Sequence, residues 1–191
     1  MKKILIIVIT LVMCSSYSQD KVQDEIPYYE VPDYSETYTA GTMAARMVDA
    51  LGFRYYWASY GLTETDLKYK ANDIGRNTGE TIKHIYDLSK IILNSTLKKP
   101  NGNDQNEDLS FEAMRKQTLV NLKTAAEILR ETDDMSQFKI IFGEQEIPFW
   151  NNINGPISDS IWHCGQIAIY RRSTNNPINP KVDHFSGKVR N

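Results

Sequence analysis

Four stretches of the sequence repeat apolar residues at the spacing of an α-helix, and this periodicity constrains the fold more than any other feature. The stretches cover about residues 42–60, 78–94, 110–131 and 157–172. In each of them the apolar positions would form a stripe along one side of a helix, and such stripes are buried against one another. The sequence therefore predicts an all-α fold, a four-helix bundle in which two connections are long enough to cross over.

Turn and cap residues indicate where these helices begin and what separates them. Asn77 and Glu80 have the pattern of a capping box at the start of the second helix. We expect the last helix to open after Gly155–Pro156, because proline suits a first helical turn. Before it, two short apolar runs flank Gly143 within Phe138–Phe149, a pattern that predicts either a small hairpin or an extended crossover.

The N-terminus has the pattern of a secretory signal peptide over residues 1–18. Two lysines are followed by the apolar stretch Ile4–Met13, and the small residues Ser16 and Ser18 stand just before Gln19. The apolar stretch is too short to span a membrane. We therefore expect an exported protein, periplasmic or secreted, whose mature chain has no transmembrane helix.

The cysteines and the net charge limit how the protein can be anchored, cross-linked and bound by partners. Cys14 leaves a lipoprotein alternative with an acyl anchor on that cysteine, although Met13 before it fits the pattern poorly. Cleavage before Gln19 would leave Cys164 as the one cysteine of the mature chain, which excludes an intramolecular disulfide. The formal net charge is −2 and no run of Lys or Arg stands out, so neither nucleic acid nor an anionic membrane is an expected partner.

After the signal peptide, residues 19–40 form a tyrosine-rich segment with prolines, which we expect to be an extended arm. Such an arm would lie over the domain and pack aromatic rings into grooves; a peptide- or sugar-binding strip is the alternative. Residues 41–191 then form one domain, since no convincing boundary interrupts them. The tail after Arg172 has little periodicity and should wrap the surface.

Asp159 and His163 are candidate metal ligands on the last helix. They lie one helical turn apart, so both project from one face, and Gln166 and Tyr170 continue the same line. A carboxylate and an imidazole at this spacing can hold one divalent cation, with His84 of the second helix as the third ligand. Zinc, nickel, iron and manganese all accept such nitrogen and oxygen donors. Gln166 and Tyr170 could orient the ligands or the substrate.

Each of these residues also has an ordinary structural explanation. Asp159, near the start of its helix, would complement the positive end of the helix dipole. His163 stands beside Trp162 and could be a hydrogen-bonded core histidine. His84 could be structural or half-exposed.

A short motif and the order of the helices resemble the DinB-like, or YfiT-like, superfamily of four-helix metal proteins. The resemblance extends from Gly41 to Gln166 and is carried by His84 and by the motif His163-Cys164-Gly165-Gln166. It implies a divalent metal held by one residue of the second helix and two residues, four apart, of the last. That family usually has three histidines, so Asp159 is a departure that would shift the metal preference.

The resemblance implies several activities without choosing one. Relatives include thiol transferases, isomerases of thiol adducts and proteins described as metal-dependent hydrolases. Because export removes the chain from the cytosolic pool of reduced thiols, hydrolysis of a small substrate is the leading expectation. A non-catalytic bundle that binds a ligand or partner is the first alternative, and a metal-dependent thiol S-transferase the second. Homodimers occur in the family, and Cys164 is expected to pack rather than to act as a nucleophile.

Overall fold

The computed structural model describes residues 26–102 and 109–191. The signal peptide expected at residues 1–18, the first part of the arm at 19–25 and the loop 103–108 lie outside the described residues. None of the helices in the two described ranges has the length and apolar character that a membrane span requires.

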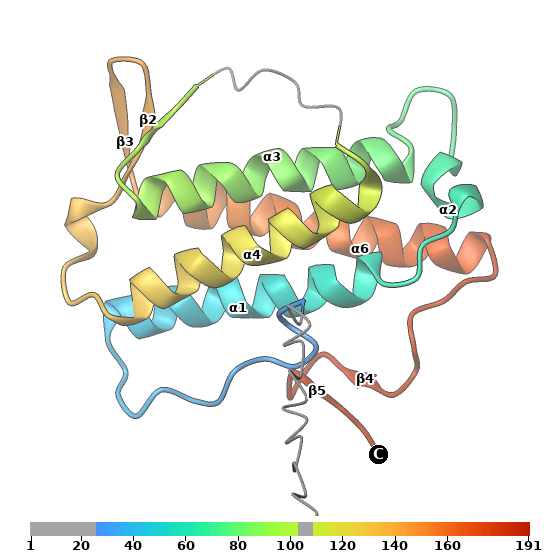
Figure 1. Ribbon diagram of the computed structural model, residues 1–191, viewed down its shortest axis with the longest axis horizontal. Helices are drawn as coiled ribbons and strands as arrows, with labels where there is room; N and C mark the ends of the chain where they lie inside the picture. Colours follow the sequence, from blue (N-terminus) through green and yellow to red (C-terminus); the bar gives the residue numbers. More distant parts are fainter. Residues whose placement is uncertain (1–25, 103–108) are drawn as a thin grey trace, which may run out of the picture.

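The described chain is mostly helical and carries small amounts of sheet (Figure 1). Its helices are α1 (Ala40–Ser59), α2 (Glu64–Lys68), α3 (Thr78–Thr96), α4 (Phe111–Arg130), α5 (Trp150–Asn152) and α6 (Ser158–Ser173). A 3₁₀ turn, η1 (Met135–Gln137), and a π-helical turn, η2 (Ile153–Ile157), lie between α4 and α6. Its strands are β1 (Pro100–Asn101), β2 (Lys139–Phe142), β3 (Gln145–Pro148), β4 (Val182–Asp183) and β5 (Lys188–Val189).

The expected segment before the last helix is a hairpin. Strands β2 and β3 are antiparallel with Ile140 opposite Ile147, and Gly143 turns the chain with a positive φ of 57°, which glycine adopts without strain. β1 extends this sheet as a parallel neighbour of β2. Three features were not expected from the sequence: the short α2, the strand β1, and the pair β4–β5 in the tail.

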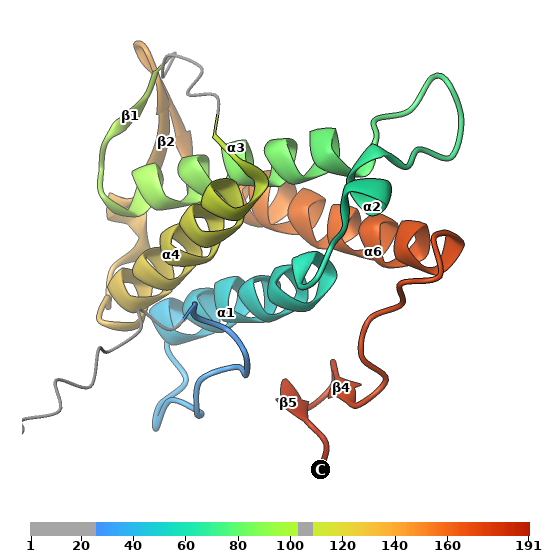
Figure 2. The ribbon, with the colours of Figure 1, turned by 45° about the vertical axis from the view of Figure 1, so that its right-hand side comes forward.

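The four long helices of the described residues, α1, α3, α4 and α6, lie side by side (Figures 1 and 2). α4 packs on α1 and α3, and α6 packs on the same two helices. In Figure 1, α3 and α4 run in one direction, whereas α1 and α6 run in the other. Only the connection from α3 to α4 must therefore return along the helices, where the sequence led us to expect two such crossovers.

The apolar stripes of these helices meet in one core. One fully buried side chain from each long helix illustrates the pattern: Leu51, Ile82, Leu122 and Ile167. The expected capping box opens α3, because the Glu80 N–H donates to Asn77 Oδ1 over 2.8 Å and the Asn77 N–H donates to the Glu80 carboxylate over 2.8 Å. Periodicity and capping thus place this helix correctly from local sequence.

The last helix, α6, begins within one residue of its expected start, but the expected role of Pro156 as its opening residue is wrong. Helical backbone begins at Trp150 and continues through η2, which contains Pro156, so the proline lies inside the helical run. The Ser158 N–H donates to the carbonyls of Ile153 and Gly155, which gives the wider turn that accommodates a residue without an N–H. Asp159 therefore does not stand at a free helix terminus, and the helix-dipole explanation for it loses its basis.

The described part of the arm packs on α1 through Tyr28 and Tyr29. The ring centroid of Tyr29 lies 5.2 Å from that of Trp57 and 6.0 Å from that of Tyr56. Tyr28 is buried, and its ring lies against Gly52 so closely that a Cβ on Gly52 would come within 2.5 Å of ring atoms. The Tyr28 hydroxyl donates to the carboxylate of Asp49 over 3.1 Å. Tyr34 and Tyr38, by contrast, are exposed, so the expected packing of aromatic rings holds for Tyr28 and Tyr29 and not for these two.

The tail after α6 packs against the arm as well as the surface. The Val31 N–H donates to the Gly187 carbonyl over 2.9 Å, and the Val189 N–H donates to the Glu30 carboxylate over 3.1 Å. The ring of His184 lies edge-on to Phe53 of α1, with centroids 5.8 Å apart. Arm, tail and α1 are therefore held together on one side of the molecule.

Candidate metal centre

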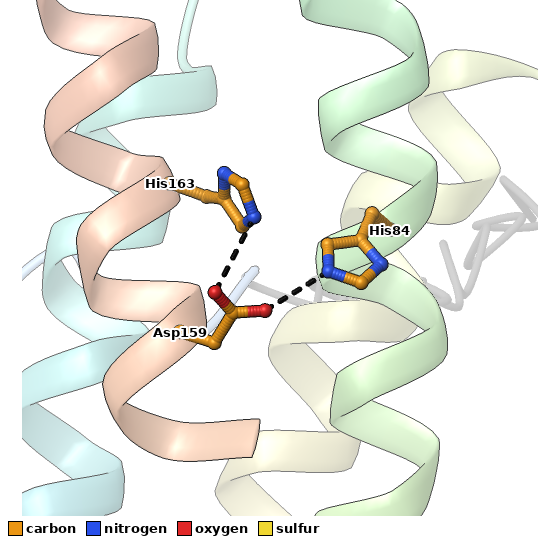
Figure 3. Close-up of side chains that lie close together, drawn as sticks. All are labelled: His84, Asp159 and His163. Carbon is orange, nitrogen blue, oxygen red and sulfur yellow. Dashed lines mark hydrogen bonds and ion pairs between the residues drawn. The ribbon is translucent and has the colours of Figure 1, made fainter. Parts of the chain in front are cut away.

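Two long helices supply the three candidate ligands (Figure 3). His84 stands in the middle of α3, between the buried residues Ile82 and Ile85, while Asp159 and His163 lie one turn apart on α6. Packing of α3 against α6 turns the three side chains toward one another in the close-up. The structure thus brings together the three residues that the sequence analysis selected.

The carboxylate of Asp159 lies between the two imidazoles. Its Oδ2 is 3.0 Å from Nε2 of His84, and its Oδ1 is 3.5 Å from Nε2 of His163. The two rings are nearly perpendicular, at 83°, with centroids 5.0 Å apart. One potential ligand atom from each of the three residues lies within 4.8 Å of the other two.

These separations fit a shared cation. Zinc ligands lie about 2.1 Å from the metal, so two ligand atoms of a tetrahedral site are about 3.4 Å apart. The distances of 3.0 and 3.5 Å, each to a different oxygen of the Asp159 carboxylate, lie close to that value. The ligand atoms of all three residues lie within 4.8 Å of one another, so the side chains would move slightly closer together around a cation. Two imidazoles and one carboxylate form a donor set that zinc, iron, manganese and nickel accept. The residues present therefore could hold a divalent metal ion.

Hydrogen bonds on the far side of His163 set the orientation of its ring. His163 Nδ1 lies 2.9 Å from Gln166 Oε1, and the amide nitrogen of Gln166 donates to the Tyr170 hydroxyl over 2.8 Å. Because the amide oxygen can only accept, Nδ1 carries the proton in the neutral form of His163, and the lone pair of that form is on Nε2. That lone pair faces Asp159, which is the arrangement a metal-binding histidine requires.

The cluster is open to solvent on one side. The exposed fraction of the side chain is 42% for Asp159, 28% for His84 and 16% for His163. Gln166 and Tyr170 contact His163 from its Nδ1 side and so do not occupy the space between the three candidate ligands. Solvent can therefore reach the cluster.

Two other reactive side chains lie apart from the cluster. His184, the remaining histidine of the chain, packs against Phe53. Cys164 follows His163 in sequence but points into the core, where burial raises the pKa of its thiol to about 12. At neutral pH this thiol stays protonated and inaccessible, which makes it a packed residue rather than a nucleophile.

The sequence analysis missed Tyr69, which ends α2 and contacts the cluster indirectly. Its ring lies edge-on to that of Tyr170, with centroids 5.3 Å apart. Tyr170 is itself buried and accepts the hydrogen bond from Gln166. No periodic pattern marks Tyr69, so only the position of α2 could have revealed this contact.

Comparisons with protein-family models, with curated proteins and with solved structures find no match to this chain. The resemblance to the DinB-like superfamily accordingly rests on the residues named above.

Proposed function

We propose that this chain is a DinB-like four-helix bundle that binds one divalent cation through His84, Asp159 and His163. The observation that carries the proposal is the convergence of three ligand atoms, from two helices, within 4.8 Å of one another. The order of the four long helices, with one candidate ligand on α3 and two on α6, supports the family assignment. We further propose that the protein hydrolyses a small substrate.

The chemistry such a cation supplies is Lewis-acid activation of water or of a substrate oxygen. The protein's own residues hold the cation and orient its ligands. Gln166 keeps His163 in the tautomer that presents Nε2, and the exposed side of Asp159 leaves room for a substrate. The signal-peptide pattern at residues 1–18 supports a location outside the cytoplasm, where reduced thiols are scarce and hydrolysis is favoured over thiol transfer.

One observation favours a non-catalytic alternative. The imidazole of His84 already lies at hydrogen-bond distance from Asp159, 3.0 Å, so the cluster is satisfied without a cation. A polar cluster of this kind could simply join α3 to α6 in a bundle that binds a ligand or partner elsewhere.

Metal content of the tag-free chain from residue 19 to 191 distinguishes the metal-binding proposal from the metal-free alternative. We expect near-stoichiometric zinc, iron, manganese or nickel in the wild-type protein, and its loss in His84→Ala, Asp159→Ala and His163→Ala. His184→Ala is the matched control, because it removes a histidine that lies outside the cluster. Equal metal in all variants, or none in the wild type after incubation with these ions, would overturn the proposal.

Activity is tested separately on the metal-loaded protein. A panel of small esters and amides should reveal hydrolysis that disappears in His163→Ala, with circular dichroism showing retained helix content. Transfer of a low-molecular-weight thiol to an electrophile, without ester or amide hydrolysis, would favour the S-transferase alternative. Metal binding without either activity would favour the binding bundle.

A further inference from the structure

A second candidate site lies where α1 begins, beside the hairpin. The structure has a cavity of about 420 Å³ between the first turns of α1, the turn η1, the ends of strands β2 and β3, and α5. Small-molecule sites typically measure about 300–1,000 Å³ and are lined mainly by apolar side chains with a few polar groups. The size of this cavity therefore suits a small ligand.

The walls of the cavity are apolar and adaptable. Met43 and Met47 of α1 and Met135 of η1 line it together with Phe149 and Trp150. Phe149 is buried, whereas Met43 and Trp150 are 53% and 74% exposed, so the cavity has a closed inner wall and an open rim. Methionine side chains adjust to ligands of irregular shape. Such walls suit a flexible alkyl chain.

The charged group in the wall is Lys139, the first residue of β2. It is half-buried, and within the described residues no carboxylate lies at ion-pair distance from its ammonium group. Lys98 lies nearby, 6.0 Å from the centre of the Phe138 ring. The acidic neighbour is Asp134, whose pKa is lowered mainly by hydrogen bonds with Ser136 and further by the charges of Lys139 and Lys98.

Among the residues that line the cavity, Lys139 supplies a positive charge and none supplies a negative one. A lysine can lay its methylene stem along an apolar wall and present its ammonium group at the opening. A ligand that complements both features has an apolar chain and an anionic end.

We propose that this cavity binds a straight-chain alkyl carboxylate, with the chain among the methionine and aromatic side chains and the carboxylate against Lys139. None of the candidate metal ligands lines the cavity, so this proposal does not depend on the metal centre. Trp150 and Ile153 of the cavity wall belong to the same helical run as Asp159, which places the two sites on one structural element.

Calorimetry with octanoate, decanoate and dodecanoate, below their micelle concentrations, tests the proposal on metal-free mature protein. Each added methylene should raise the affinity about fourfold until the chain fills the cavity, after which the affinity should level off. Decanol should bind about tenfold more weakly than decanoate, because it lacks the charge that Lys139 would meet. Absence of binding, or equal affinity for decanol and decanoate, would overturn the proposal.

Two variants assign the binding to this cavity. Lys139→Met keeps the apolar stem and should abolish the preference for decanoate over decanol, while Met43→Glu places a carboxylate at the exposed rim and should weaken decanoate at least tenfold. Lys68→Met, on the exposed surface of α2, is the matched control and should bind as the wild type does. Unchanged binding in both cavity variants would overturn the assignment.

An apolar rim could instead contact a second copy of the chain. Analytical sedimentation of the same proteins tests this alternative. A wild-type dimer that fails to bind decanoate and becomes monomeric in Met43→Glu would overturn the carboxylate proposal in favour of a dimer interface.

Discussion

Two hydrogen bonds decide which nitrogen of His163 can bind a cation. The Tyr170 hydroxyl accepts from the Gln166 amide nitrogen, so the amide oxygen faces His163 Nδ1. In the neutral ring this places the lone pair on Nε2, which is directed at the cluster. Gln166, which is not a candidate ligand, therefore orients His163, which is one.

Replacing Gln166 should weaken metal binding without removing a ligand. We expect Gln166→Leu to lower the metal affinity about 10- to 100-fold, the usual effect of losing such a partner. Gln166→Glu keeps an acceptor for Nδ1 and should stay closer to the wild type. Competition with a chromophoric chelator measures both constants, and equal affinity in the leucine variant and the wild type would contradict this role.

Asp66 joins α2 to the end of α6, a connection that periodicity does not suggest. Its carboxylate accepts from the Thr63 N–H over 2.7 Å, from the Asn176 amide over 2.7 Å, and from the Thr174 hydroxyl. Burial alone would raise the pKa of Asp66, but the hydrogen bonds from Thr174, Thr63 and Asn176 outweigh it and lower the pKa to about 2. The ionised form is therefore the one that holds these elements together.

This shift predicts an acid-dependent part of the stability. Because the folded-state pKa of Asp66 lies below the unfolded value, its stabilisation is complete above about pH 4 and is lost as the pH falls toward 2. Asp66→Asn should lower the free energy of unfolding by about 1–2 kcal/mol at pH 7, and the difference should shrink between pH 4 and pH 2. Urea unfolding of both proteins between pH 7 and pH 2 measures this difference in the free energy of unfolding.

The control for this experiment is Asp73→Asn, which changes a fully exposed carboxylate that pairs with Lys70. Surface substitutions of this kind usually change stability by less than about 0.5 kcal/mol. A pH-independent difference between Asp66→Asn and the wild type would contradict the assigned linkage.

A cation bound at the centre would link α3 and α6, whose ligands are 75 or more residues apart in sequence. Since the unfolded chain cannot present all three ligands together, binding should stabilise the folded state. At a free metal concentration of 100 Kd this amounts to about 2.7 kcal/mol, which corresponds to a rise in Tm of about 5–10 °C for a chain of this size.

Thermal unfolding followed by circular dichroism checks this prediction. The wild type and His184→Ala should show the same rise with zinc, while His84→Ala should show none. A rise of similar size in His84→Ala would mean that the stabilising cation binds elsewhere.

Much of the fold follows from local pattern. Helical periodicity placed the four long helices, the Asn77–Glu80 box placed the start of α3, and Gly143 marked the hairpin. These signals act over a few residues, so they can be read without knowing the packing. Local pattern did not predict the backbone before α6: Pro156 suggested a helix start, yet it lies within a π turn that continues the helical backbone from Trp150.

In the candidate site, too, one part follows from local sequence and another from the packing of distant segments. The spacing of Asp159 and His163 along one helix is local, and the sequence predicted that they share a face. That His84 meets them, however, depends on how α3 packs on α6, a relation between segments far apart in the chain. The same holds for the cavity beside Lys139, whose walls come from residues 40–47 and 135–153. Core packing rather than periodicity brings these two segments together.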